Sequence, residues 1–140
     1  MRVVLDADVM IGALDGSDSH HARSRKLFRA WAKQDVTRLI SVVNLTEILV
    51  APAAERSRLQ AAREAIAALG VAVHQPGEAV GVEAARLRRR HPISLPDAYC
   101  LATARYAEAE IVSFDDKVLR AAELEGIATS GTAARRPPPS

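Results

Sequence analysis

The chain has 140 residues, a mass of 15.0 kDa and 49% hydrophobic residues, enough to bury one sizeable core. Its net charge of +2 identifies no class of partner, because the excess comes from Arg135 and Arg136 near the end and the rest of the chain holds 17 basic and 17 acidic residues. Cys100 is the only cysteine, which excludes an intramolecular disulfide and any multi-cysteine zinc site built from this chain alone.

Several features bear on the compartment and the domain plan. The sequence reaches Asp6 too early for the apolar region of a signal peptide, and no stretch is long and uncharged enough to span a bilayer. Together with the single cysteine, this predicts a soluble, cytoplasmic protein that does not associate with membranes. We expect one domain over residues 1–130 and disorder in the Pro-rich tail, residues 131–140.

Short apolar runs alternate along the chain with longer helical patterns. In the first half they predict a strand at 2–5, a helix at 7–14, a helix at 18–34 capped by Ser17 or Asp18, a strand at 39–43 and a helix through Glu47 that ends before Pro52. In the second half they predict a helix at 53–69 stopped by Gly70, a strand at 71–74, helices at 78–90 and 96–107, a strand at 111–114, a helix at 116–123 and a last short strand at 127–128.

This order of elements predicts the fold class. Strands that are separated by helices, and that are apolar throughout rather than alternating, are typical of parallel sheets buried on both faces. We therefore expect a three-layer α/β/α fold with a central, mainly parallel sheet of four to five strands. In such sheets ligands bind outside the carboxyl ends of the strands.

Acidic residues stand at several of these predicted strand ends and helix starts. Asp6 and Asp115 each end a strand, Glu47 follows another, and Asp97 opens a helix. Carboxylates that converge repel one another unless a cation lies between them, so convergence would indicate a metal site. Each acid taken singly also has an ordinary explanation as a helix cap, because Asp6 precedes a helix and the other three lie in capping-box patterns with Asn44, Ser94 and Ser113.

The four acidic segments, taken in order, resemble a known family. The chain is similar to the PIN domain and, within it, to the VapC-like ribonuclease toxins of type II toxin–antitoxin pairs. The resemblance rests on Val3-Val4-Leu5-Asp6-Ala7-Asp8-Val9-Met10-Ile11, Asn44-Leu45-Thr46-Glu47-Ile48, Leu95-Pro96-Asp97-Ala98-Tyr99-Cys100-Leu101-Ala102-Thr103-Ala104 and Val112-Ser113-Phe114-Asp115, and it covers residues 2–127.

The resemblance implies a PIN-like fold and hydrolysis of RNA phosphodiesters by water bound to Mg²⁺ or Mn²⁺. It makes Asp6, Glu47, Asp97 and Asp115 the metal ligands and catalytic residues, directly or through water. Side chains beside them would orient these carboxylates or add charge: Asp8, Asn44, Ser113 and Asp116. We assign Asp115 rather than Asp116 to the metal, because Asp116 would complete a capping pattern with Ser113.

The resemblance also implies partners, namely an RNA substrate, a cognate antitoxin that covers the acids, and a second copy of the chain in a homodimer. The predicted helix at 78–90 ends in cations that would contact RNA or an acidic antitoxin: Arg86, Arg88, Arg89 and Arg90. The cations of the predicted helix at 18–34 fit either a solvated face or a phosphate track. Trp31 fits either the core or an exposed apolar patch, and such a patch or the Ala-rich helix at 53–69 would serve the antitoxin or the second copy.

Two other interpretations compete with a nuclease. Asp6-Ala7-Asp8-Val9 also resembles the nucleophile motif of haloacid-dehalogenase-like phosphatases, in which Asp6 would be phosphorylated and Asp8 would act as general acid and base. A non-catalytic PIN-like interaction module is the second alternative. We leave His20 and His21 out of the site as solvated residues, and we expect Cys100 to be a packed thiol rather than a nucleophile.

Overall fold

The computed structural model describes residues 1–130, and the tail predicted to be disordered, residues 131–140, lies outside them. The elements are β1 (Arg2–Leu5), α1 (Ala7–Leu14), α2 (His21–Gln34), β2 (Thr37–Ser41), α3 (Val42–Leu49), the short 3-10 helix η1 (Pro52–Ala54), α4 (Arg56–Ala68), β3 (Val71–His74), α5 (Glu78–Arg90), α6 (Leu95–Ala107), β4 (Glu110–Val112) and α7 (Asp116–Glu125).

The strands form one sheet in the order β3-β2-β1-β4, and every pair is parallel. β1 and β2 are the inner strands, and Val4 of β1 stands opposite Leu39 of β2 on one side and Ile111 of β4 on the other. Parallel strands need long crossovers, and the helices between them provide these. The predicted parallel sheet is confirmed, with four strands from the predicted range of four to five.

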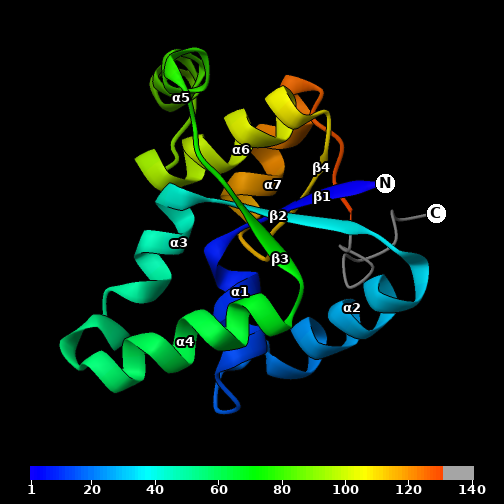
Figure 1. Cartoon of the computed structure of the whole chain (residues 1–140). Coiled ribbons are helices and arrows are strands. Elements are labelled where there is room, and N and C mark those ends of the chain that lie inside the picture. The colour runs from blue at the N-terminus through cyan, green and yellow to red at the C-terminus, as the bar shows by residue number, and fades with distance from the viewer. Residues whose placement is uncertain (131–140) are drawn as a thin grey trace.

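Helices cover both faces of the sheet (Figure 1). Successive residues of a strand point to opposite faces, so Val4 packs with α5, α6 and α7 whereas Val3 and Leu5 pack with α1 and α2. Ile111 and Val112 of β4 divide in the same way. Two apolar layers therefore hold the sheet, as predicted for a three-layer fold. Within residues 1–130, no helix combines the length and the apolar character that crossing a membrane requires.

Several strand and helix boundaries differ from the prediction. β4 ends at Val112 rather than residue 114, because Ser113 to Asp115 form the turn that caps α7, and α7 continues to Glu125. β2 ends at Ser41 rather than residue 43, because the Ser41 hydroxyl accepts a hydrogen bond from the Val43 N–H at 3.2 Å and starts α3 there. Pro52 begins a separate 3-10 turn, so α4 starts only at Arg56. The predicted last strand is reduced to a single bridge between Ile111 and Thr129.

Two predictions about α2 are wrong. The helix begins at His21, because Ser17 bonds back to Asp15 in a tight turn and neither Ser17 nor Asp18 is the cap of the helix. The exposed apolar patch expected around Trp31 does not exist, since Trp31 is only 4% exposed and packs edge-on against Phe28 in the core. The predicted stop at Gly70 is confirmed by its left-handed backbone, with φ of 72°.

Candidate functional site

The carboxyl ends of β1 and β4 form the centre of the site. β2 and β3 extend the sheet on one side of β1 and β4 on the other, and such a reversal opens a crevice at the strand ends. Asp6 follows β1, and its N–H donates to the Val112 carbonyl at 2.9 Å. Ser113 follows β4, and its hydroxyl donates to Asp6 Oδ2 at 2.6 Å. The strand pairing thus brings together side chains 107 residues apart.

Asp6 is a buried carboxylate, only 4% exposed. It caps α1 as predicted, because its Oδ1 accepts the Ala7 N–H at 2.8 Å. Burial, followed by the negative charge of Asp8, raises the pKa of Asp6 from the ordinary 3.8 to about 7, although the Ser113 hydrogen bond opposes the rise. A bound cation would remove this penalty on the charged form.

Asp8 lies two residues into α1 and faces the loop after β4. Its Oδ2 accepts the Phe114 N–H at 3.0 Å, whereas its Oδ1 is buried without a hydrogen-bond partner among the described residues. Burial raises the pKa of Asp8 to about 6 against the effect of the Phe114 N–H, and the charge of Asp115 adds to the rise. A buried oxygen that lacks a partner is free to accept one from outside the chain.

Glu47 enters the site from α3, and the prediction about its position was partly wrong. It is the sixth residue of the helix, and Ser41 rather than Asn44 is the cap, because β2 ends two residues early. Asn44 instead joins two elements: its Nδ2 donates to Glu47 Oε1 at 3.3 Å and to the Pro96 carbonyl of α6 at 3.2 Å. Partial burial raises the pKa of Glu47, and Asp97 repels it further.

Asp97 opens α6 in the predicted capping box. The Ser94 hydroxyl accepts the Asp97 N–H, and the Ser94 N–H donates to Asp97 Oδ2, each at 3.2 Å. The same carboxylate raises the pKa of Asp6 and of Glu47. Asp97 therefore caps its helix and also faces the other acids, so the two explanations that the sequence left open are compatible.

Asp115, not Ser113, is the cap of α7, so the predicted capping pattern between Ser113 and Asp116 is wrong. Its Oδ1 accepts the Lys117 N–H at 2.8 Å, and its own N–H donates to the Ser113 hydroxyl at 3.0 Å. Asp116 is the exposed first residue of the helix. The negative charge of Asp115 contributes to the raised pKa of Asp8, so Asp115 lies nearer to the other acids than the outward-facing Asp116.

The pKa of Cys100 is affected by several of the acids at once. It is fully buried in α6, as expected for a packed thiol. Burial and then the negative charges around it raise the pKa of the thiol far above its usual range, and those charges come from Asp6, Asp8, Asp97 and Glu47. Residues from α1, α3 and α6 therefore act electrostatically on one point.

The donors at this site fit a hard divalent cation in their chemistry. All the acids offer carboxylate oxygens, and the buried oxygens Asp8 Oδ1 and Asn44 Oδ1 have no partner within residues 1–130. In that part of the chain, no three His, Cys, Asp or Glu side chains already stand close enough to share one ion. A shared ion would thus require side-chain rotation or bridging water. The raised pKa values of Asp6, Asp8 and Glu47 mean that a cation near them would stabilise their charged forms.

An aromatic and basic group beside the acids was missed by sequence reasoning. The centres of the Phe114 and His20 rings lie 4.6 Å apart, and the Arg23 guanidinium carbon lies 4.2 Å from the centre of the Phe114 ring. His21 is also engaged, because its Nδ1 lies 2.8 Å from the Gly12 carbonyl oxygen, so the prediction that both histidines are merely solvated is wrong. The available signal was the position of Phe114 between Ser113 and Asp115.

The arginines at the end of α5 are divided between ion pairs and solvent. Arg86 pairs with Glu83 at 3.6 Å, and Arg90 pairs with Glu125 at 3.2 Å. Arg88 and Arg89 are exposed in the last turn. Part of this predicted contact surface is therefore neutralised within the chain.

Solved structures with the same fold include three from bacterial toxin–antitoxin systems. A toxin–antitoxin complex from Klebsiella pneumoniae is 22% identical with a TM-score of 0.71, covering 91% of this chain and 96% of that one. VapC20 from Mycobacterium tuberculosis, a sarcin–ricin loop cleaving toxin, is 18% identical with a TM-score of 0.69 and coverage of 85% and 94%. VapBC2 from Rickettsia felis, bound to a promoter DNA fragment, is 14% identical with a TM-score of 0.72 and coverage of 93% and 98%.

Sequence comparison gives the family. A search of curated proteins found no match. The family model of the PIN domain matches residues 3–124, which include all four acidic segments and the strands that position them. With most of the chain matched and the parallel three-layer fold in place, this protein belongs to the PIN-domain family.

Proposed function

We propose that this protein is an endoribonuclease that depends on Mg²⁺ or Mn²⁺. The observation that carries the proposal is the meeting of Asp6 and Ser113 where β1 and β4 end, with Asp8 and Asp97 adding negative charge. Carboxylates that raise one another's pKa are stabilised as anions by a cation, and carboxylate oxygens suit hard ions. Membership of the PIN family favours this interpretation over the phosphatase alternative.

Asp6, Glu47, Asp97 and Asp115 would hold the ion, directly or through water. When bound, the ion would lower the pKa of a coordinated water and neutralise charge on the phosphodiester. Ser113 fixes one Asp6 oxygen by donating to it, and Asn44 fixes Glu47 in the same manner. Both oxygens of Asp6 accept a hydrogen bond, from Ser113 and from the Ala7 N–H, and each carboxylate oxygen keeps a second lone pair that an ion could use.

We further propose that the protein is the VapC-like toxin of a toxin–antitoxin pair. Support comes from similarly folded chains of a Klebsiella pneumoniae toxin–antitoxin complex and of Rickettsia felis VapBC2. An antitoxin that masks the acids, a homodimer and a cytoplasmic location remain predictions, as does contact of RNA or antitoxin with Arg86, Arg88, Arg89 and Arg90.

Cleavage of RNA tests the proposed activity. The protein should cut single-stranded RNA with Mg²⁺ or Mn²⁺ but not with EDTA, and Glu47→Gln should lower the rate by about 100-fold or more. Glu64→Gln, the same change on the exposed side of α4, is the matched control. Release of phosphate from a monoester, lost only in Asp6→Asn, would instead indicate a phosphatase.

Induced expression tests the proposed biological role. We expect growth arrest that the product of an adjacent antitoxin gene relieves, and mapping of cleavage sites in total RNA would identify the substrate. Cleavage without growth arrest would separate the enzyme from the toxin role.

A further inference from the structure

Arg23 brings a cation to the edge of the acidic site. Its guanidinium carbon lies 4.2 Å from the centre of the Phe114 ring, and Phe114 directly precedes Asp115 and donates its N–H to Asp8. Ser113, which directly precedes Phe114 in the loop between β4 and α7, donates a hydrogen bond to Asp6. α2 therefore starts against the loop that carries the acids of β4 and α7.

The hydrogen-bonding capacity of Arg23 is not used within residues 1–130. Its Nε is buried without a hydrogen-bond partner, and no carboxylate of this part of the chain lies within ion-pair distance. A guanidinium placed over an aromatic ring makes the contact through its face, so the N–H groups at its edge can still donate to an anion. A bidentate anion such as a phosphate group matches that geometry.

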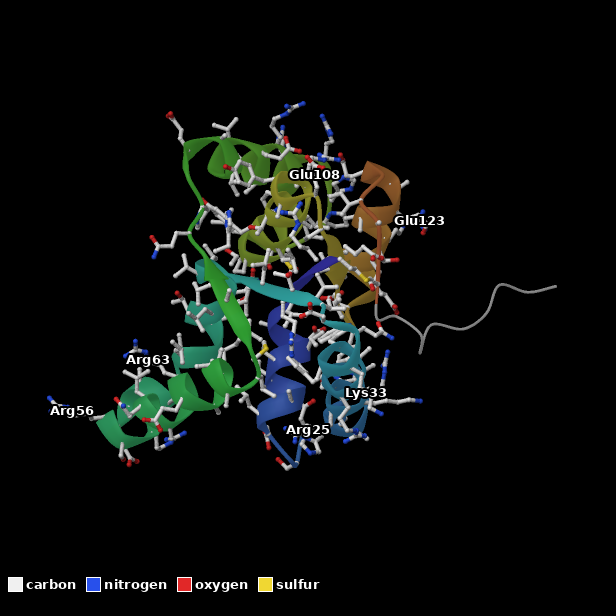
Figure 2. The ribbon with its side chains drawn as sticks, turned by 45° about the vertical axis from the view of Figure 1, so that its right-hand side comes forward. Arg25, Lys33, Arg56, Arg63, Glu108 and Glu123 are labelled. Carbon is white, nitrogen blue, oxygen red and sulfur yellow. The ribbon has the colours of Figure 1, made fainter. Side chains whose placement is uncertain are left out.

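Beyond Arg23, α2 is a helix of unneutralised cations. Its 14 residues contain five lysines and arginines, Arg23 included, and no acid. Lys26, Arg29 and Lys33 line one open hollow of about 440 Å³ on the same face. Figure 2 shows Arg25 and Lys33 projecting from α2 away from the body of the protein. Residues three and four apart on a helix are neighbours, so the cations form a continuous row.

Three basic residues of α5 and α6 are paired within the chain, whereas Arg88 and Arg89 of α5 are exposed and unpaired among the residues that the structure describes. Arg105 bonds both Glu83 and Glu125, Arg86 pairs with Glu83, and Arg90 pairs with Glu125. Paired cations offer little net charge to a polyanion, whereas the row on α2 offers all of it.

On these grounds we propose that Arg23 binds a backbone phosphate of the RNA next to the cleaved bond, and that Lys26, Arg29 and Lys33 bind the phosphates of the strand as it leaves the site along α2. This inference rests on the proposed nuclease activity and assigns its substrate path. The contacts are to phosphates, so they contribute affinity and position without reading the base sequence.

Binding and cleavage by matched charge variants test the path. Lys26→Gln/Lys33→Gln removes two charges from α2, and Arg56→Gln/Arg63→Gln removes two from α4, where Figure 2 shows both arginines away from α2. With a labelled single-stranded RNA in calcium buffer, we expect the α2 pair to weaken binding about tenfold and to reduce the magnitude of the slope of log affinity against log salt by about 1.4. The α4 pair should change neither.

Arg23→Gln should lower kcat/KM about 10- to 100-fold with Mg²⁺ and reduce the salt slope by about one, and Arg23→Lys should restore the slope because it keeps the charge. A loss of packing alone would not change the salt slope. A melting curve of each variant identifies misfolding, and if Arg23→Gln misfolds the α2 pair decides the outcome.

The path would be overturned, with the nuclease intact, by α2 variants that cleave and bind as wild type, by an equal loss from the α4 pair, or by a loss only from Arg88→Gln/Arg89→Gln on α5. If the α2 pair lost binding to polyglutamate while its binding to RNA stayed unchanged, the cations of α2 would instead bind an acidic protein segment. That result would also overturn the RNA path. A wild-type chain that binds RNA without cutting it would contradict the proposed nuclease activity alone. A wild-type chain that neither binds nor cuts RNA would contradict the nuclease activity and the RNA path together.

Discussion

Asp6 is the only charged side chain that is buried among residues 1–130, and its place is a compromise between folding and function. A carboxylate removed from water destabilises the folded chain unless its charge is compensated. Two hydrogen bonds, from Ser113 and Ala7, compensate only part of it, since the pKa still rises to about 7. Selection for stability alone would have placed a neutral residue here.

Asp6→Asn should therefore stabilise the metal-free protein. We expect the free energy of unfolding in EDTA at pH 8 to rise by roughly 1 kcal/mol, because the amide keeps the shape of the side chain without its charge. Urea unfolding measures the change. Asp35→Asn, the same substitution at an exposed helix end, is the control and should have little effect. A destabilised Asp6→Asn would show that the charge is already compensated without metal.

Elements meet at the site through a few polar contacts, and Asn44 provides the one between α3 and α6. It is buried, and it bonds Glu47 within its own helix and Pro96 across to the next. Contacts between α3 and both α1 and α6 place this helix across the carboxyl edge of the sheet. The orientation of Glu47 therefore depends on a side chain that lies one turn away.

Asn44→Ala should destabilise the protein and weaken catalysis together. The Pro96 carbonyl and Glu47 would lose their donor, at a cost of about 1–3 kcal/mol, and RNA cleavage should fall about 10- to 100-fold. Thr46→Ala is the control, because its hydroxyl bonds only the Val42 carbonyl of the same helix. Activity at the wild-type level, with reduced stability, would show that Asn44 is structural only.

α5, α6 and α7 are joined on the other side by Glu125. Its side chain is 9% exposed and accepts from His91 at 2.6 Å, from Arg90 and from Arg105. The hydrogen bond from His91, followed by those from the arginines, lowers the pKa of Glu125 from 4.5 to about 2, although its partial burial opposes this.

A lowered pKa in the folded state predicts a loss of stability in acid. The contribution of Glu125 is fully present above pH 4.5, its ordinary value, and is lost as the pH falls toward 2. Glu125→Gln should therefore be less stable than wild type at pH 7 and flatten the fall in unfolding free energy between pH 5 and about 2. Glu55→Gln, which removes an exposed pair, should keep the wild-type slope. Parallel slopes for Glu125→Gln and wild type would contradict the assignment.

At the scale of the whole molecule, the site joins the ends of elements from both layers. Asp6 and Asp8 belong to one layer with α1, whereas Asp97 and Asp115 begin α6 and α7 of the other. An ion held between them would tie the layers together at the carboxyl edge of the sheet (Figure 1). Ligand binding to the folded state alone stabilises it by mass action.

Mn²⁺ or Mg²⁺ should therefore raise the melting temperature of the wild-type chain. At a metal concentration a hundredfold above the dissociation constant, the free energy of unfolding should rise by about 2.7 kcal/mol. Differential scanning calorimetry with and without EDTA, at constant ionic strength, measures the shift. Asp6→Asn should lose most of it. An equal shift with Na⁺ at the same ionic strength would indicate screening rather than a site.

The sequence by itself determined the parallel α/β plan, because apolar runs and helix caps depend on residues a few positions apart. It also placed Asp6 at the end of a strand and Asp97 in its capping box, for the same reason. Asp115 was predicted to end a strand, but β4 stops at Val112 and Asp115 caps α7 instead. The sequence placed Glu47 in the correct helix but too near its start, since the start of α3 depended on whether Ser41 or Asn44 would cap it, and both are good caps.

Only the tertiary structure decided which of these residues meet. Ser113 reaches Asp6 across 107 positions and Asn44 reaches Pro96 across 52, because the strand order places β4 beside β1 and α3 beside α6. The stacking of Arg23 on Phe114 has the same origin. No local pattern encodes strand order, which results from the packing of two apolar layers on one sheet and therefore from the whole chain at once.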